Sequence, residues 1–145
     1  MPPKKAIKFK VVKTSGFPTL ETLLKNEDSA FEMEETLQNL EMIYNTNIRL
    51  SEDYSGILTD KEEKLWTDEF DEKTLDQIKP SQRKKALEIN NKIMQGAKRL
   101  AMNEAKELYQ EFKDKTKGKS GTMTQIAKDF NNFAMSTSRL KKLRL

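Results

Sequence analysis

The spacing of apolar residues follows a helical period through most of the chain. From Ser81 to about Lys115, apolar side chains recur every three or four residues without an intervening proline or turn cluster. This pattern predicts one amphipathic helix of about 35 residues, roughly 50 Å long at about 1.5 Å per residue. Gly96 lies inside it and marks either a close crossing or a bend. The predicted inner face consists of Ile89, Ile93, Ala97, Leu100, Ala101, Ala105, Leu108 and Phe112.

Capping signals predict where the shorter helices begin. Residues 29–32 (Ser-Ala-Phe-Glu) and 59–62 (Thr-Asp-Lys-Glu) both have the form of a capping box, in which the first and fourth residues bond each other's backbone N–H. The first helix should end near Thr46 or Asn47, and the second should continue to about Gln77, before Pro80. A short helix is expected around residues 20–24, and a last one from Thr122 to the C-terminus.

Charge divides this single domain into three segments. Residues 1–16 carry five lysines and no acid, residues 17–80 have a net charge of −11, and residues 81–145 have a net charge of +10. We therefore expect a basic N-terminal arm, an acidic helical segment and a basic helical segment. In the arm, Ile7, Phe9 and Val11 alternate with polar positions, which also fits one short strand.

The expected fold is mainly α, either a small helical bundle or an extended helical protein. Hydrophobic residues make up 35% of the chain and charged residues 34%, so its core should be thin and completed against a partner. The long helix also offers a face for a homo-oligomer. Since no apolar run approaches about 18 residues, we expect no membrane partner. Without a secretory signal, we expect an intracellular location, cytoplasmic or nuclear, or a place within an assembled particle.

The residue types present argue against most catalytic chemistry. The chain has no histidine and no cysteine, which excludes ordinary zinc sites, disulfides and nucleophiles paired with histidine. Residues 117–121 (Lys-Gly-Lys-Ser-Gly) lack the spacing of a phosphate-binding loop, and the acidic stretch 68–72 lacks that of a calcium loop. We therefore expect a protein that is not an enzyme, with no catalytic residue, no metal and no cofactor.

Basic residues recur every seven positions along the predicted long helix. Such a repeat drifts only about 20° per heptad, so the side chains form one outward ridge with steps of about 10 Å. A ridge of this kind fits an acidic partner, either nucleic-acid phosphates or an acidic protein surface. Alternatively, the ridge is solvated or pairs with the acidic segment of its own chain. It consists of Lys85, Lys92, Arg99, Lys106 and Lys113, with Arg139, Lys141, Lys142 and Arg144 following near the C-terminus.

Two C-terminal stretches, 124–131 and 136–140, resemble the helix-turn-helix of bacterial regulators. The resemblance covers about 20 residues and implies that Ser136, Ser138 and Arg139 lie on a recognition helix. Asn132 and Thr137 stand where the motif has aliphatic residues, and one continuous amphipathic helix accounts for the same sequence.

Together these features predict a helical binding or assembly protein. We expect a subunit, scaffold or adaptor of a larger complex, a nucleoprotein or viral particle included, that contacts an acidic partner through its basic C-terminal half. The alternative is a small nucleic-acid-binding protein or transcription regulator with a degenerate helix-turn-helix.

Overall fold

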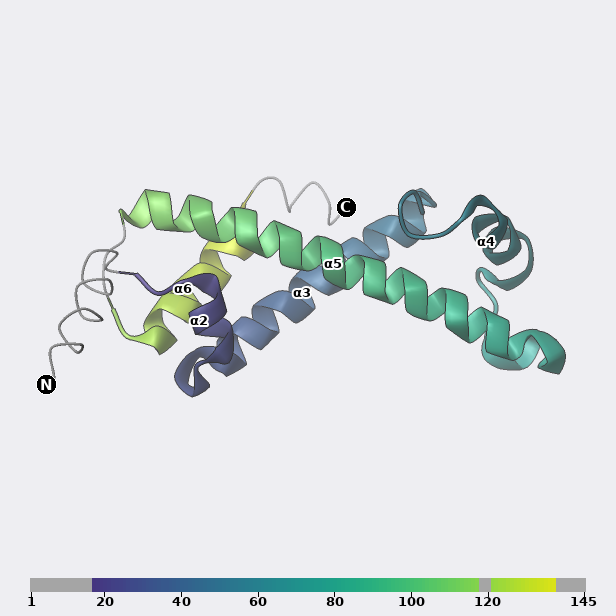
Figure 1. The fold of residues 1–145 in the computed structure, drawn as a ribbon, viewed down its shortest axis with the longest axis horizontal. Coiled ribbons are helices and arrows are strands. Elements are labelled where there is room, and N and C mark those ends of the chain that lie inside the picture. Colours follow the sequence, from purple (N-terminus) through teal and green to yellow (C-terminus); the bar gives the residue numbers. More distant parts are fainter. Residues whose placement is uncertain (1–16, 118–120, 138–145) are drawn as a thin grey trace, which may run out of the picture.

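The computed structural model describes residues 17–117 and 121–137, and this part of the chain is mainly α-helical, as predicted. Two long antiparallel helices, α3 (Glu27–Ser51) and α5 (Arg83–Thr116), cross each other and form the frame (Figure 1). Helices α2 (Leu20–Lys25) and α6 (Met123–Ser136) pack at one end of the frame, and α4 (Asp60–Leu65) lies at the other. The predicted basic arm and short strand at 1–16 lie outside the described residues.

The long helix is confirmed, since α5 runs for 34 residues without a break. Every residue of its predicted inner face is buried except Leu100, which is half-buried. Of the close crossing and the bend predicted at Gly96, the structure has a close approach. The segment that approaches α5 there is the loop at Ile57 and not another helix. A Cβ placed at Gly96 would come within 2.8 Å of Cγ1 of Ile57.

The start predicted for α3 is wrong by three positions. Asn26 is the N-cap, and its side-chain oxygen accepts from the backbone N–H of Asp28 at 2.8 Å. Ser29 is instead buried inside the helix, where its hydroxyl donates to the carbonyl of Leu23 at 2.7 Å and ties α3 to α2. The helix continues to Ser51 and ends where Glu52 adopts a left-handed conformation with φ of 55°.

The second capping box is confirmed, but the helix after it is shorter than predicted. Thr59 and Glu62 bond each other's backbone N–H at the start of α4. A π-helical turn, η1 (Trp66–Phe70), follows directly, and the chain then breaks near Glu72, where φ is 65°. Two short 3-10 turns, η2 (Leu75–Gln77) and η3 (Pro80–Gln82), lead into α5. Pro80 therefore begins the approach to α5, because proline is well suited to the first turn of a helix.

The core consists of two hydrophobic clusters that share α3 and α5. The first lies among α2, α6, the first half of α3 and the second half of α5. Its aromatic rings are neighbours, with centroids 5.2 Å apart for Tyr109 and Phe130 and 5.6 Å apart for Phe112 and Phe130. The hydroxyl of Tyr109 donates to the carbonyl of Pro18 at 2.7 Å, which holds the start of the described chain on this cluster.

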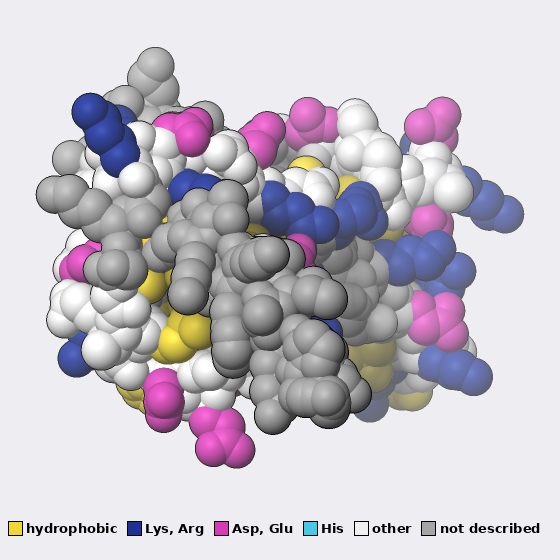
Figure 2. Space-filling view, turned by 60° about the vertical axis from the view of Figure 1, so that its left-hand side comes forward, with side chains coloured by type: hydrophobic (Ala, Val, Ile, Leu, Met, Phe, Trp, Pro, Cys, Tyr) yellow, Lys and Arg dark blue, Asp and Glu magenta, His cyan; other side chains and the backbone are white. Residues whose placement is uncertain are grey.

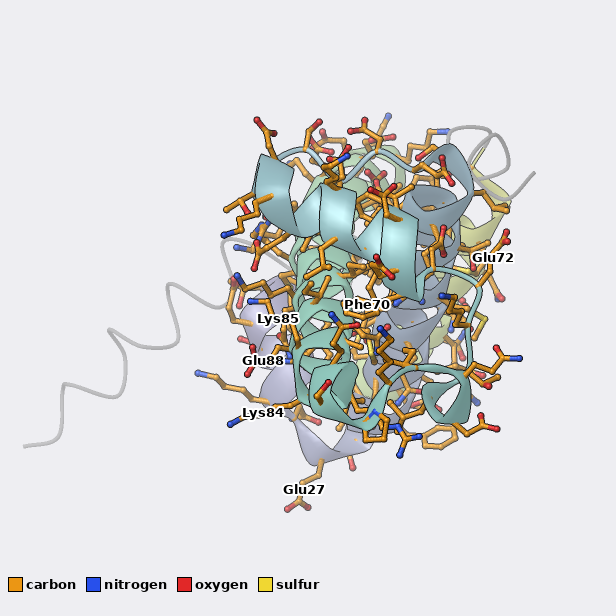
Figure 3. All side chains as sticks on the ribbon, turned by 90° about the vertical axis from the view of Figure 1, so that its right-hand side faces the viewer. Glu27, Phe70, Glu72, Lys84, Lys85 and Glu88 are labelled. Carbon is orange, nitrogen blue, oxygen red and sulfur yellow. The ribbon has the colours of Figure 1, made fainter. Side chains whose placement is uncertain are left out.

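The second cluster joins the first half of α5 to the irregular segment between α3 and α5. It contains Trp66, whose ring packs edge to face against Phe70 with the two ring centroids 6.3 Å apart. Trp66 is buried and packs against the other residues of this cluster. Figure 3 shows Phe70 directed inward, whereas Lys84, Lys85 and Glu88 project from the outer side of α5.

Candidate interaction surfaces

The predicted basic ridge lies along α5. Lys85, Lys92, Arg99 and Lys106 are exposed, and Lys113 is half-buried. The four basic residues predicted to extend it, Arg139, Lys141, Lys142 and Arg144, lie outside the described part of the chain. The space-filling view of Figure 2 shows Lys and Arg side chains on the molecular surface with acidic side chains nearby.

The front half of the ridge, which consists of Lys85, Lys92 and Arg99, contacts other residues of the same chain. Lys92 forms an ion pair with Glu62 of α4, and the Arg99 guanidinium donates to the carbonyl of Gly56 at 3.2 Å. Lys85 is 4.0 Å from the Glu88 carboxylate on α5 itself. Arg99 and Lys92 thus hold the 52–65 segment against α5. The alternative that the ridge pairs with the acidic segment of its own chain is confirmed at Lys92.

The Lys92–Glu62 pair has a clear electrostatic effect. The hydrogen bond from Lys92 and that from the Thr59 backbone lower the pKa of Glu62 from 4.5 to about 2. Glu62 retains only 12% of its side-chain exposure, while Lys92 retains 51%. The ion pair is therefore partly shielded by the fold, and only the lysine is open to solvent.

The rear half of the ridge, which consists of Lys106 and Lys113, differs from the front half in its contacts. The side chains of Lys106 and Lys113 form no ion pair or hydrogen bond with any other residue that the structure describes. Lys115 lies beside them in sequence but over the Phe133 ring, with Nζ 5.5 Å from its centroid. Exposed carboxylates also occur here, at Glu107 and Asp114. The rear half is a solvent-facing surface of mixed charge with two available cations.

The helix-turn-helix is contradicted by α6. This helix runs without interruption from Met123 to Ser136, so it includes Asn132 and the residues just before it, where the motif needs its turn. Thr122 caps it as predicted, accepting from the backbone N–H of Gln125 at 3.1 Å. The inner face is continuous across the supposed turn, with Phe130 and Ala134 both buried. A turn between Phe130 and Ala134 would separate these two side chains from one another.

A second surface was missed by the sequence analysis. Four large apolar side chains are exposed along one seam between α3, α5 and the segment after η1; they are Met42, Leu75, Leu87 and Met94. The spacing of Leu87 and Met94, seven residues apart and off the buried stripe, is the signal that could have indicated them.

Polar groups in the irregular segment are less well satisfied than in the first cluster. The Tyr54 hydroxyl and the Trp66 indole N–H are buried neighbours, yet neither makes a hydrogen bond of normal geometry within the described chain. Burial raises the pKa of Tyr54, and the Asp71 carboxylate raises it further.

Over 17–117 and 121–137, acidic side chains form no cluster suited to a metal ion. No helix in these ranges is long and apolar enough to cross a membrane.

Comparisons with known proteins identify no relative. No protein-family model matches the chain, and no match to a curated protein or to a solved structure was found.

Proposed function

We propose that this protein is a non-enzymatic helical binding protein, a subunit or adaptor of a larger complex, that contacts an acidic protein surface through the rear half of the α5 ridge. The observation that carries the proposal is the division of the ridge. Lys92 and Arg99 are used inside the fold, whereas the side chains of Lys106, which is exposed, and Lys113, which is half-buried, have no ion pair or hydrogen bond within the described chain.

The rigidity of the scaffold supports a binding role. Both lysines stand on a helix whose opposite side is buried, at Ala105, Leu108 and Phe112. The cations are consequently held at a fixed spacing of about 10 Å, at about 1.5 Å per residue over seven residues. A partner with matching carboxylates would bind without first ordering the backbone, which lowers the entropic cost of association.

An acidic protein is favoured over nucleic acid by the charges beside the ridge. Glu107 and Asp114 are exposed on the same half of α5 and would repel a closely placed phosphate backbone. A protein surface can meet such a mixture with its own lysines and carboxylates. Electrostatic complementarity of this kind contributes mainly to specificity and association rate.

The test uses the full chain with poly-L-glutamate and duplex DNA as probes. We expect binding to poly-L-glutamate that weakens as salt rises and is lost in Lys106→Glu/Lys113→Glu. A matched control, Lys61→Glu/Lys128→Glu, makes the same change in net charge at exposed positions off the ridge and should retain binding. If the control loses as much affinity as the ridge variant, net charge and not the ridge determines binding. If DNA binds more tightly than poly-L-glutamate, the partner class is nucleic acid.

A further inference from the structure

The seam between α3 and α5 concentrates the exposed apolar surface of the molecule. Six large apolar side chains are exposed in the part of the chain that the structure describes, and four of these lie along the seam. Met42 of α3 is 64% exposed, and Leu87 of α5 is 53% exposed. Exposed apolar side chains gathered on one face usually mark a protein interaction site, and methionine adapts readily to a partner.

Two hollows lie along the seam. One hollow of about 220 Å³ opens between Met42 and Met94, with Ala97 among its lining residues. Another, of about 160 Å³, opens between Leu75 and Leu87, over Trp66 and Phe70. Each hollow therefore has a protruding apolar side chain on either side.

Asn90 and Arg49 join the two hollows into one surface. The Asn90 side-chain oxygen accepts from Arg49 at 2.7 Å, and its amide donates to the sulfur of Met94 at 3.6 Å. Arg49 also donates to Asn45 at 2.9 Å and lies over the Trp66 ring, with Cζ 5.7 Å from the centroid. The polar groups in the middle of the seam are thus bonded to one another, and burying them beneath a partner leaves few of them unsatisfied.

Charge differs between the two sides of the seam. On the α5 side, Lys84 and Lys98 are exposed one turn before Leu87 and one turn after Met94. On the α3 side, Glu41 lines the first hollow, and Glu34 lies two turns before it and accepts from the Gln38 side chain at 3.2 Å. At the first hollow the surface is therefore cationic along α5 and anionic along α3, with the apolar side chains between these charges, while Lys73 lines the second hollow.

We propose that this seam binds the same seam of a second copy of the chain. A two-fold axis parallel to the seam would place α5 of one copy opposite α3 of the other. The cationic side of each copy then meets the anionic side of its partner, while the apolar centres cover each other. Charge self-complementarity is what an isologous interface requires, since the same patch must recognise itself.

The proposed dimer does not depend on the ridge. Lys106 and Lys113 differ from Leu87 and Met94 by about a quarter of a turn or more around α5, at about 100° per residue. The ridge therefore stays accessible in the dimer, which would present two copies of it. The buried stripe of α5, which the sequence also allowed as a face for self-association, is occupied within the chain by α3 and α6.

The first test measures the mass of the full chain by sedimentation velocity across a wide range of concentrations. We expect a monomer–dimer equilibrium whose dissociation constant rises at least about tenfold in Met94→Glu, because a charge replaces a central apolar contact. The matched control is Leu50→Glu, since Leu50 is 64% exposed on α3 but lines neither hollow. A chain that stays monomeric at all concentrations overturns the proposal. A dimer weakened equally by both variants also overturns it.

The second test uses charge reversal and does not depend on the apolar variant. Lys98→Glu and Glu41→Lys should each dissociate the dimer, because each places like charges opposite one another twice. Mixing the two variants should restore a dimer that contains one of each, since both contacts then join opposite charges. Recovery of the mixed dimer would be specific to a second copy as the occupant. Failure of mixing to restore association, with both variants folded by circular dichroism, contradicts the arrangement.

Discussion

The two halves of the molecule reach a buried core by different means. The half with α2 and α6 is built from regular helices, and its buried hydroxyls at Ser29 and Tyr109 are hydrogen-bonded at 2.7 Å. The half with α4 is built from a π-helical turn, two 3-10 turns and loops. There Tyr54 and Trp66 each keep a buried polar group without a normal hydrogen bond in the described chain.

This difference indicates how each half is held. In the regular half, apolar stripes on several helices fill one cluster, so the sequence period alone specifies the contacts. In the irregular half, the segment is fastened to α5 by particular interactions, chiefly Lys92 with Glu62, Arg99 with Gly56, and the contact of Ile57 with Gly96. The basic ridge predicted as a partner surface is therefore also, over its front half, a structural element.

The largest expected effect tests whether the two halves unfold together. Phe130→Ala should lower the free energy of unfolding by about 3–5 kcal/mol, because a fully buried ring is removed from the first cluster. Since α3 and α5 pass through both clusters, we expect the unfolding transition of the second half to move by the same amount. Trp66 is the single tryptophan and lies in that second half, so its fluorescence reports it, while far-UV circular dichroism reports the whole chain.

Coincident shifts of both signals in Phe130→Ala would show one cooperative unit. A circular dichroism transition that moves while the Trp66 transition stays in place would show that the two halves are independent. In that case the comparison between them becomes one between two separately stable units.

A smaller effect is expected where the irregular segment approaches α5. Gly96→Val should cost about 1–3 kcal/mol, because its Cβ alone would stand 2.8 Å from Cγ1 of Ile57 and force the loop away. The matched control is Gln95→Val, which places the same β-branched residue at the adjacent exposed position of α5. The difference between the two free energies of unfolding isolates the clash. Equal values for both variants would mean that the loop moves aside without cost.

The regular helices show why much of the fold could be predicted. The length of α5, its inner face and the caps at Thr59 and Thr122 all follow from local period and local capping chemistry. The start of α3 was misplaced because Ser29 has the form of a cap but serves a tertiary contact with Leu23. The π-helical turn at 66–70 and the break at Glu72 depend on packing against α5, which no local pattern records.

The candidate surfaces were predictable to a lesser degree. The heptad spacing correctly gave a line of cations that is exposed over most of its length. It could not show that Lys92 and Arg99 contact residues 30 and 43 positions earlier, because those contacts depend on where the 52–65 segment folds back. The seam was missed for a similar reason, since Met42 and Met94 meet only once α3 crosses α5.

The smallest expected effect concerns the ion pair that fastens α4 to α5, and it depends on pH. The pKa of Glu62 is lowered from 4.5 to about 2 in the folded chain, so the charged form stabilises the fold above pH 4.5. That contribution should disappear as the pH falls from 4.5 to about 2, because the carboxylate then takes up a proton in the folded state as well. Glu62→Gln should therefore lower the stability by at most about 1 kcal/mol at neutral pH, because the lysine of the pair remains open to solvent, which screens the interaction. Glutamine at this position can still bond the backbone N–H of Thr59, so the capping box is kept and only the charge is lost.

Glu63→Gln is the matched control, since it removes a neighbouring charge in the same first turn of α4 without an ion pair in the described structure. Urea unfolding of the three proteins from pH 7 to pH 2 measures the difference at each pH. If Glu62→Gln and Glu63→Gln behave alike throughout, Lys92 does not hold α4, and the front of the ridge becomes as available to a partner as the rear.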